Sequence, residues 1–133
     1  MRIVKRVERW FPAPNDPDDS EHLIRHLTPG EILDTINNAT NQETKYRVDE
    51  KSKGLVPEMA SHTKPGAISL AQFLLALVDW KNMFDAEGAA MACSEENKIR
   101  AYREIDGYAQ FISECREKLH GDITADEEAR TKN

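Results

Sequence analysis

Two consecutive stretches of the chain decide the fold: LAQFLLALVDW at Leu70–Trp80 and KNMFDAEGAAMACSEEN at Lys81–Asn97. The first stretch has no charge before its second-last residue and indicates a helix that is buried on most of its circumference. It is too short to cross a bilayer, which needs about 20 apolar residues. Asp85–Gly88 has the composition of a tight turn, because glycine adopts left-handed backbone conformations without steric cost. Ser94 then caps a new helix with an acidic first turn. We expect the rest of the chain to pack around this unit.

Trp80 ends the apolar run at a polar boundary, where we expect its indole N–H to find a hydrogen-bond partner. Of the two cysteines, Cys93 precedes a helix start, which lowers the pKa of a thiol. The sequence places no histidine beside it, and Cys93 and Cys115 lack the paired spacing of a metal or redox motif. We therefore expect two reduced, structural thiols.

The length, composition and net charge of the chain limit the class of protein to which it can belong. With 133 residues, 39% hydrophobic and 32% charged, it has the size of one domain, part of which is solvated. The net charge of −6 argues against a general nucleic-acid binder, which would carry a basic face. The basic start, residues 2–11, is followed by prolines and acids instead of a secretory apolar segment, so we expect a cytoplasmic protein.

The N-terminal third predicts one strand and one helix. Residues 2–11 are rich in β-branched and aromatic residues and predict a strand, which the proline-rich loop 12–20 ends. Thr28, Pro29 and Glu31 form a capping box with proline at the first helical position, and predict a helix over residues 29–39.

His22 and His26 are four residues apart and would share a face if this segment were helical. The sequence places no third metal ligand near them, so we expect surface histidines, with a metal-dependent enzyme as the alternative reading. The chain has no glycine-rich phosphate loop, no paired-cysteine motif and no nucleophile elbow. We therefore expect no catalytic residues, no cofactor and no bound metal.

The remaining segments complete an α+β domain with about three to four helices. Residues 42–66 mix polar residues with prolines and favour a mobile loop, with a short strand at Tyr46–Asp49 as the alternative. A helix from Glu95 to Arg103 is followed by a break at Asp106–Gly107 and by an amphipathic helix that ends at Gly121. The domain therefore spans residues 1–121, and the polar residues 122–133 predict a disordered tail.

The order of these pieces resembles the tail assembly chaperones of long-tailed, siphovirus-like phages and prophages. The resemblance is carried by the apolar helix ending in Trp80, the turn Asp85–Gly88 and the helix start Cys93–Asn97. Upstream, a strand near Trp10–Pro12 and the helix start Leu27–Glu31 fit the same order. The resemblance leaves out residues 42–64 and the polar tail.

The resemblance implies a non-enzymatic role in virion morphogenesis in the host bacterial cytoplasm. Such chaperones bind the tape-measure protein, keep its apolar helices in solution and help to recruit tail-tube subunits. It implies neither a nucleic-acid partner nor a membrane. Many members also exist in a longer, frameshifted form.

A chaperone of this kind needs an apolar groove on an acidic body. Aromatic and methionine side chains suit such a groove, although they suit a core equally well. Self-association is a further expectation, because the run from Phe73 to Val78 exceeds what one small core covers. The alternative function is an acidic inhibitor or regulatory protein that binds a basic surface through residues 16–50. The predicted partner-binding residues are Trp80, Met83, Phe84, Met91, Trp10 and Phe11.

Overall fold

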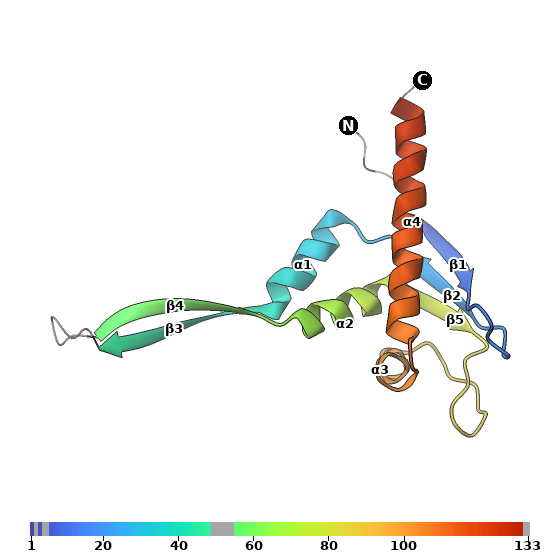
Figure 1. Ribbon diagram of the computed structural model, residues 1–133, viewed down its shortest axis with the longest axis horizontal. Coiled ribbons are helices and arrows are strands. Elements are labelled where there is room, and N and C mark those ends of the chain that lie inside the picture. Colours follow the sequence, from blue (N-terminus) through green and yellow to red (C-terminus); the bar gives the residue numbers. More distant parts are fainter. Residues whose placement is uncertain (2, 4–5, 49–54, 132–133) are drawn as a thin grey trace.

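The computed structural model describes the backbone of residues 1, 3, 6–48 and 55–131, and the side chains of these residues outside 41–63 and 130–131. The chain forms an α+β domain, as predicted, with a three-stranded antiparallel sheet, a separate two-stranded hairpin and four helices (Figure 1). In chain order the elements are β1 (Glu8–Pro12), β2 (Glu21–Arg25), α1 (Pro29–Ala39), β3 (Thr40–Val48), β4 (Leu55–Thr63), α2 (Pro65–Ala76), β5 (Leu77–Lys81), α3 (Glu95–Glu104) and α4 (Tyr108–Thr131).

The core lies between the sheet and α4, which runs across it (Figure 1). The strand order is β1–β2–β5, so β2 is central and pairs on both edges. The central strand buries alternate residues, His22 and Ile24. The apolar side chains that are at most 1% exposed come from the sheet and from helices α2, α3 and α4: Ile24, Ala76, Leu77, Ala101, Ile112 and Leu119.

Helix α1 begins and ends where the sequence predicts. The backbone N–H of Glu31 donates to Thr28 Oγ1 at 3.2 Å, and the Thr28 N–H donates to Glu31 Oε1 at 3.1 Å. This reciprocal pair satisfies two of the amide groups that a helix start leaves without intrahelical partners.

The apolar run that opens the central unit is not one helix, which corrects the prediction. Helix α2 begins earlier, at Pro65, and ends at Ala76, and Leu77–Lys81 forms β5. The strand exists because β2 offers its backbone groups: His22 pairs with Trp80 and Glu21 with Lys81. An uninterrupted apolar run has no periodicity that separates a buried helix from a buried strand.

The predicted mobile loop of residues 42–66 is also corrected. Strands β3 and β4 pair antiparallel in nine consecutive register pairs, from Thr40–Thr63 to Val48–Leu55. The hairpin extends away from the sheet and helices as a long arm (Figure 1). Each strand depends on pairing with the other, between residues that are 7 (Val48–Leu55) to 23 (Thr40–Thr63) positions apart, which explains why local composition favoured a loop. Residues 49–54 of the predicted loop lie outside the described residues.

Helix α4 replaces the predicted disordered tail up to Thr131, whereas residues 132–133 lie outside the described part. The predicted break is present, with Gly107 at φ +75°. Gly121 does not end the helix, because a glycine costs only about 1 kcal/mol in a helix interior and Ala, Glu and Arg around it favour the helix. Ile123 also packs against the core, and Arg9 Nη1 lies 2.5 Å from Asp122 Oδ2. No helix of the described residues is long and apolar enough to span a membrane.

Candidate functional site

The six predicted partner-binding residues divide between the core and the surface. Trp80, Met83 and Phe11 belong to the core, with 6–8% of each exposed. The side chains of these three residues are therefore part of the core and are not available as an exposed groove. Trp10 is partly buried, and Lys81 Nζ lies 4.2 Å from the centre of its ring. Phe84 is the one of the six with a largely open side chain, and Met91 is partly buried beside it.

Phe84 lies at the surface together with Ile105, from the turn between α3 and α4. Phe84 is 43% exposed and Ile105 is 41% exposed. Both line two neighbouring hollows: one of about 190 Å³ that also includes Met91 and Ala101, and one of about 360 Å³. We call these three apolar residues, Phe84, Met91 and Ile105, the Phe84–Ile105 surface. Because Phe84 and Ile105 line both hollows, these two residues form an apolar ridge between them, and Met91 lines the smaller hollow.

A tight hairpin holds Phe84 at the surface. Asp85 Oδ1 accepts hydrogen bonds from the backbone N–H groups of Glu87 at 3.0 Å and of Ala89 at 2.9 Å. Gly88 has φ +80°, as the predicted turn requires, and the backbone N–H of Met91 donates to the Met83 carbonyl at 2.8 Å. An aspartate that bonds the backbone two and four residues ahead stabilises such a turn. Phe84 therefore has a defined position.

The core fixes both ends of this surface. Trp80 Nε1 donates to the Met91 carbonyl at 2.7 Å, so the indole has a hydrogen-bond partner, as expected from the sequence, which did not predict which group it would be. Ile105 is the C-cap of α3, and its N–H donates to the Ala101 carbonyl at 3.1 Å. Gly107 then reverses the chain into α4. The two apolar side chains are thus supported by the same core from two directions.

Charged groups surround the smaller hollow. Arg100 and Glu104 line it and lie one turn apart on α3, with Nε and Oε2 at 3.6 Å. Asp85 lines it from the hairpin. An apolar centre with a charged rim is the usual composition of a protein-binding surface.

A buried polar chain borders the larger hollow. Ser20 Oγ lies 3.0 Å from His22 Nε2, and His22 Nδ1 lies 2.9 Å from the Tyr108 hydroxyl. His22 is 1% exposed, so the prediction of a surface histidine is wrong for this residue. Burial lowers the pKa of His22 to about 4 and raises the pKa of Tyr108. His22 is therefore neutral at pH 7.

The direction of these hydrogen bonds indicates a structural role. The Ser20 hydroxyl donates to Asp16, and this bond is the main cause that keeps the pKa of the Asp16 carboxyl below its usual value. Ser20 Oγ must then accept from His22 Nε2–H, and His22 Nδ1 must accept from the Tyr108 hydroxyl. A nucleophilic serine donates its proton to the histidine instead. The chain of bonds thus ties the loop before β2 to α4.

The other candidate reactive groups are similarly placed for structure. Burial raises the pKa of Cys93 and of Cys115 to about 11, so neither thiol is activated at neutral pH. His26 does not meet His22; its Nε2 lies 3.1 Å from Nδ1 of His120, and the two rings stack. Burial, and then the neighbouring His120, lower the pKa of His26. The described residues contain no group of three or more side chains able to hold a metal ion.

Comparison of the chain with family models, with curated proteins and with solved structures finds no match. We therefore infer a function from the surface features of the protein itself.

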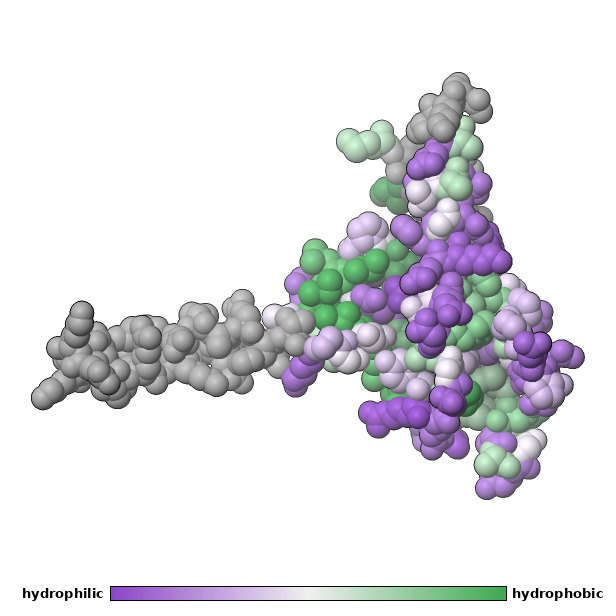
Figure 2. Space-filling model, in the orientation of Figure 1, coloured by the Kyte–Doolittle hydropathy of each residue, from purple (hydrophilic) through white to green (hydrophobic). Residues whose placement is uncertain are grey.

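A second apolar surface lies on α1 and α2. Figure 2 shows apolar atoms gathered over α1. Leu33 is 55% exposed and Ile36 is 39% exposed on that helix, and Leu75 on α2 is 41% exposed. We call these three residues the α1–α2 surface. Leu75 belongs to the apolar run that the sequence indicated to be larger than one core needs.

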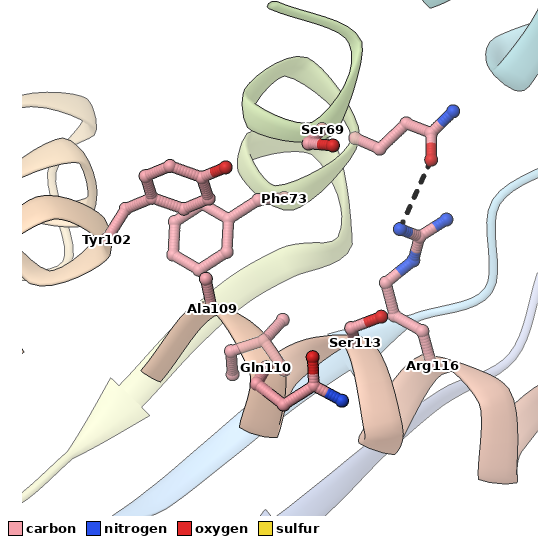
Figure 3. A pocket seen from close by; sticks show the side chains of 9 residues that line it. Ser69, Phe73, Tyr102, Ala109, Gln110, Ser113 and Arg116 are labelled. Carbon is pink, nitrogen blue, oxygen red and sulfur yellow. Dashed lines mark hydrogen bonds between the residues drawn. The ribbon is translucent and has the colours of Figure 1, made fainter. Parts of the chain in front are cut away.

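A third hollow, of about 270 Å³, lies where α2, α3 and α4 meet (Figure 3). Arg116 Nη1 donates to Gln72 Oε1 at 3.3 Å, the hydrogen bond that the dashed line from Arg116 marks in Figure 3. Gln72 Nε2 in turn donates to Thr35 Oγ1 at 3.2 Å. Burial lowers the pKa of Arg116. This relay joins α4 to α2 and α1 and fixes the position of the α1–α2 surface.

Ile105 is absent from the residues predicted from sequence. It stands alone between a charged helix and the Asp106–Gly107 break, so no local pattern distinguishes it from a turn residue. Only the reversal of the chain at Gly107 brings it beside Phe84. The pairing of His22 with Tyr108, 86 residues later, likewise has no local signal.

Proposed function

We propose that this protein is a non-catalytic tail assembly chaperone, which binds the tape-measure protein through the Phe84–Ile105 surface and helps to recruit tail-tube subunits in the host bacterial cytoplasm. The observation that carries the proposal is the apolar ridge of Phe84 and Ile105 between hollows of about 190 and 360 Å³. The resemblance of the central unit to this class of chaperone supplies the identity of the partner.

The geometry of the ridge suits an amphipathic helix. Such a helix presents apolar side chains at steps of three and four residues, and successive side chains can enter hollows on the two sides of a ridge. Aromatic and methionine side chains contribute large contact areas and adapt to varied sequences. The charged rim of Arg100, Glu104 and Asp85 would orient the bound helix.

The acidic inhibitor stays the alternative, without a structural observation that favours it. The predicted acidic span is not one open surface in its described part. Asp16 accepts hydrogen bonds from its own loop, Glu31 pairs with Arg6, and Glu21 lies 3.9 Å from Lys81. These carboxylates have internal partners.

The test is co-expression with the tape-measure protein, followed by measurement of its solubility and by co-purification. We expect a stable complex with the wild-type chain. Phe84→Asp and Ile105→Asp should each weaken the complex about tenfold or more, since each places a charge in the apolar contact. Ala92→Asp is the matched control, because Ala92 is exposed nearby and lines neither hollow.

Two results would contradict the proposal. If the wild-type chain forms no complex and does not change the solubility of the tape-measure protein, the chaperone function is rejected. If a complex forms but both aspartate variants bind like Ala92→Asp, the function stands and the binding surface is wrong.

A further inference from the structure

The β3–β4 hairpin, which we call the arm, is a sheet with only two strands. Among the described residues β3 pairs with β4 alone, and β4 with β3 alone. The arm leaves the body at its base, where the Lys64 N–H donates to the Ala39 carbonyl at 3.2 Å (Figure 1). A two-stranded ribbon is marginally stable on its own in water, and its open edges are templates for another strand. The arm is therefore suited to pairing with another chain.

The two edges of the arm are not equivalent. β4 contains Pro57, in register with Tyr46. Proline has no N–H, and in sheets it lies on edge strands at positions that face away from the neighbouring strand. The outer edge of β4 is thus interrupted, whereas β3 contains no proline, although the N–H of its first residue, Thr40, already donates to the Asn37 carbonyl as the C-cap of α1. The free edge for strand pairing is the edge of β3.

We propose that two copies of this chain form a dimer in which their β3 strands pair antiparallel about a two-fold axis at Thr44. Thr44 is the middle residue of β3, so all nine residues of each strand would overlap. This register places Glu43 opposite Lys45 of the second copy, and the symmetry repeats the pair. Opposite charges across neighbouring antiparallel strands stabilise a sheet. The strand is therefore complementary to itself.

The two neighbouring registers of the same parity each place one pair of like charges on the two-fold axis. With the axis at Glu43, the two Glu43 residues would lie opposite each other, and with the axis at Lys45, the two Lys45 residues would do so. Like charges in directly opposite positions destabilise a sheet. The axis at Lys45 would also place Glu43 opposite Arg47, but of the three axes only the one at Thr44 has no pair of like charges, and it also gives the greatest overlap.

The α1–α2 surface is continuous with the proposed interface. β3 begins at Thr40, directly after the last residue of α1, so Ile36 lies one helical turn from the base of the arm. In the proposed register Val48 of the second copy lies opposite Thr40. Val48 is in register with Leu55, so the last register pair of the second arm consists of two apolar residues. In the dimer this pair would lie at the base of the first arm, next to α1, the helix on which Leu33 and Ile36 are exposed.

The test is the molar mass in solution, measured by sedimentation and light scattering over a range of concentrations. The wild-type chain should reach twice its mass of 15.1 kDa. Glu43→Lys and Lys45→Glu each create two like-charge pairs across the axis and should raise the dimer dissociation constant about tenfold or more. Glu114→Lys, which makes the same charge change at an exposed position on α4, should leave the dimer unchanged.

Mixing the two variants decides between this register and a general effect of charge. A Glu43→Lys chain beside a Lys45→Glu chain has opposite charges at both contacts, so the equimolar mixture should form dimers although each variant alone does not. A wild-type chain of 15.1 kDa at every concentration would overturn the proposal, as would a dimer that neither variant weakens or a mixture that stays monomeric. These outcomes are independent of the tape-measure complex, which depends on Phe84 and Ile105.

Discussion

The core and the Phe84–Ile105 surface contain the same kinds of side chain in opposite environments. Leu77, Ile112 and Leu119 are at most 1% exposed, whereas Phe84 and Ile105 are both more than 40% exposed. The buried residues lie on β5 and α4, where the sheet and a long helix cover each other. The exposed residues lie in a hairpin and a helix–helix turn, which no element covers. Apolar residues in the first group hold the fold, and in the second they are available to a partner.

The two regions should therefore respond differently to the same kind of substitution. A core residue contributes the burial of its own surface and the packing of its neighbours, so its loss leaves a cavity. A half-exposed apolar residue contributes less to folding, because it keeps part of its surface in water in the folded chain. Three predictions, in order of decreasing effect, test this difference.

The largest effect should come from Leu119→Ala. Leu119 is 0% exposed in the core beside the sheet, and we expect its truncation to lower the free energy of unfolding by about 2–5 kcal/mol. Chemical denaturation followed by circular dichroism measures this change. Lys118→Ala, at the preceding exposed position on α4, is the control. A loss below about 1 kcal/mol would show that α4 does not close the core.

The intermediate effect should be a pH dependence of the free energy of unfolding that His22 causes. His22 lies between the core and the larger hollow. Its pKa is about 4 in the folded chain and about 6.5 when unfolded, so the folded state binds fewer protons between these values. The stability that His22 contributes is complete above pH 6.5 and is lost as the pH falls toward 4. For one proton the slope reaches about 1.4 kcal/mol per pH unit.

Because the pKa of His26 is also lowered, the wild-type profile contains both histidines. His22→Gln keeps the ability to bond with Ser20 and Tyr108 but does not titrate. The difference between the unfolding free energies of this variant and the wild type, measured from pH 7.5 to 4, isolates His22. Parallel profiles would mean that His22 is accessible to protons in the folded chain.

The smallest effect on stability should come from Phe84→Ser. Phe84 is 43% exposed, so Phe84→Ser removes only part of the burial that a core side chain provides, and we expect a loss of about 1–2 kcal/mol of unfolding free energy. The thermal midpoint should fall only modestly, together with weaker binding of the tape-measure protein. A large loss of stability would place Phe84 in the core, and any binding defect would then be indirect.

Features that depend on a few adjacent residues follow from the sequence. The capping box of Thr28 and Glu31 fixes the start of α1, Ser94 fixes the start of α3, and Gly88 and Gly107 permit two chain reversals. Each is decided by hydrogen bonds or steric limits within about four residues. The α+β class was also predicted, and so was a hydrogen-bond partner for the indole of Trp80, because a buried indole N–H usually finds one.

Features that depend on distant segments were decided only by the tertiary structure. Leu77–Lys81 is a strand because β2 pairs with it, the arm exists because β3 and β4 pair, and α4 continues past Gly121 because Ile123 packs on the core. His22 is buried because Tyr108 meets it from α4. Of the proposed partner surface, Phe84 and Met91 are among the residues predicted from the sequence, whereas Ile105 was found only in the fold. The sequence by itself thus determined where helices start and turns occur, because those are local interactions. The tertiary structure alone determined which apolar residues became core and which remained exposed, because burial depends on what the rest of the chain covers.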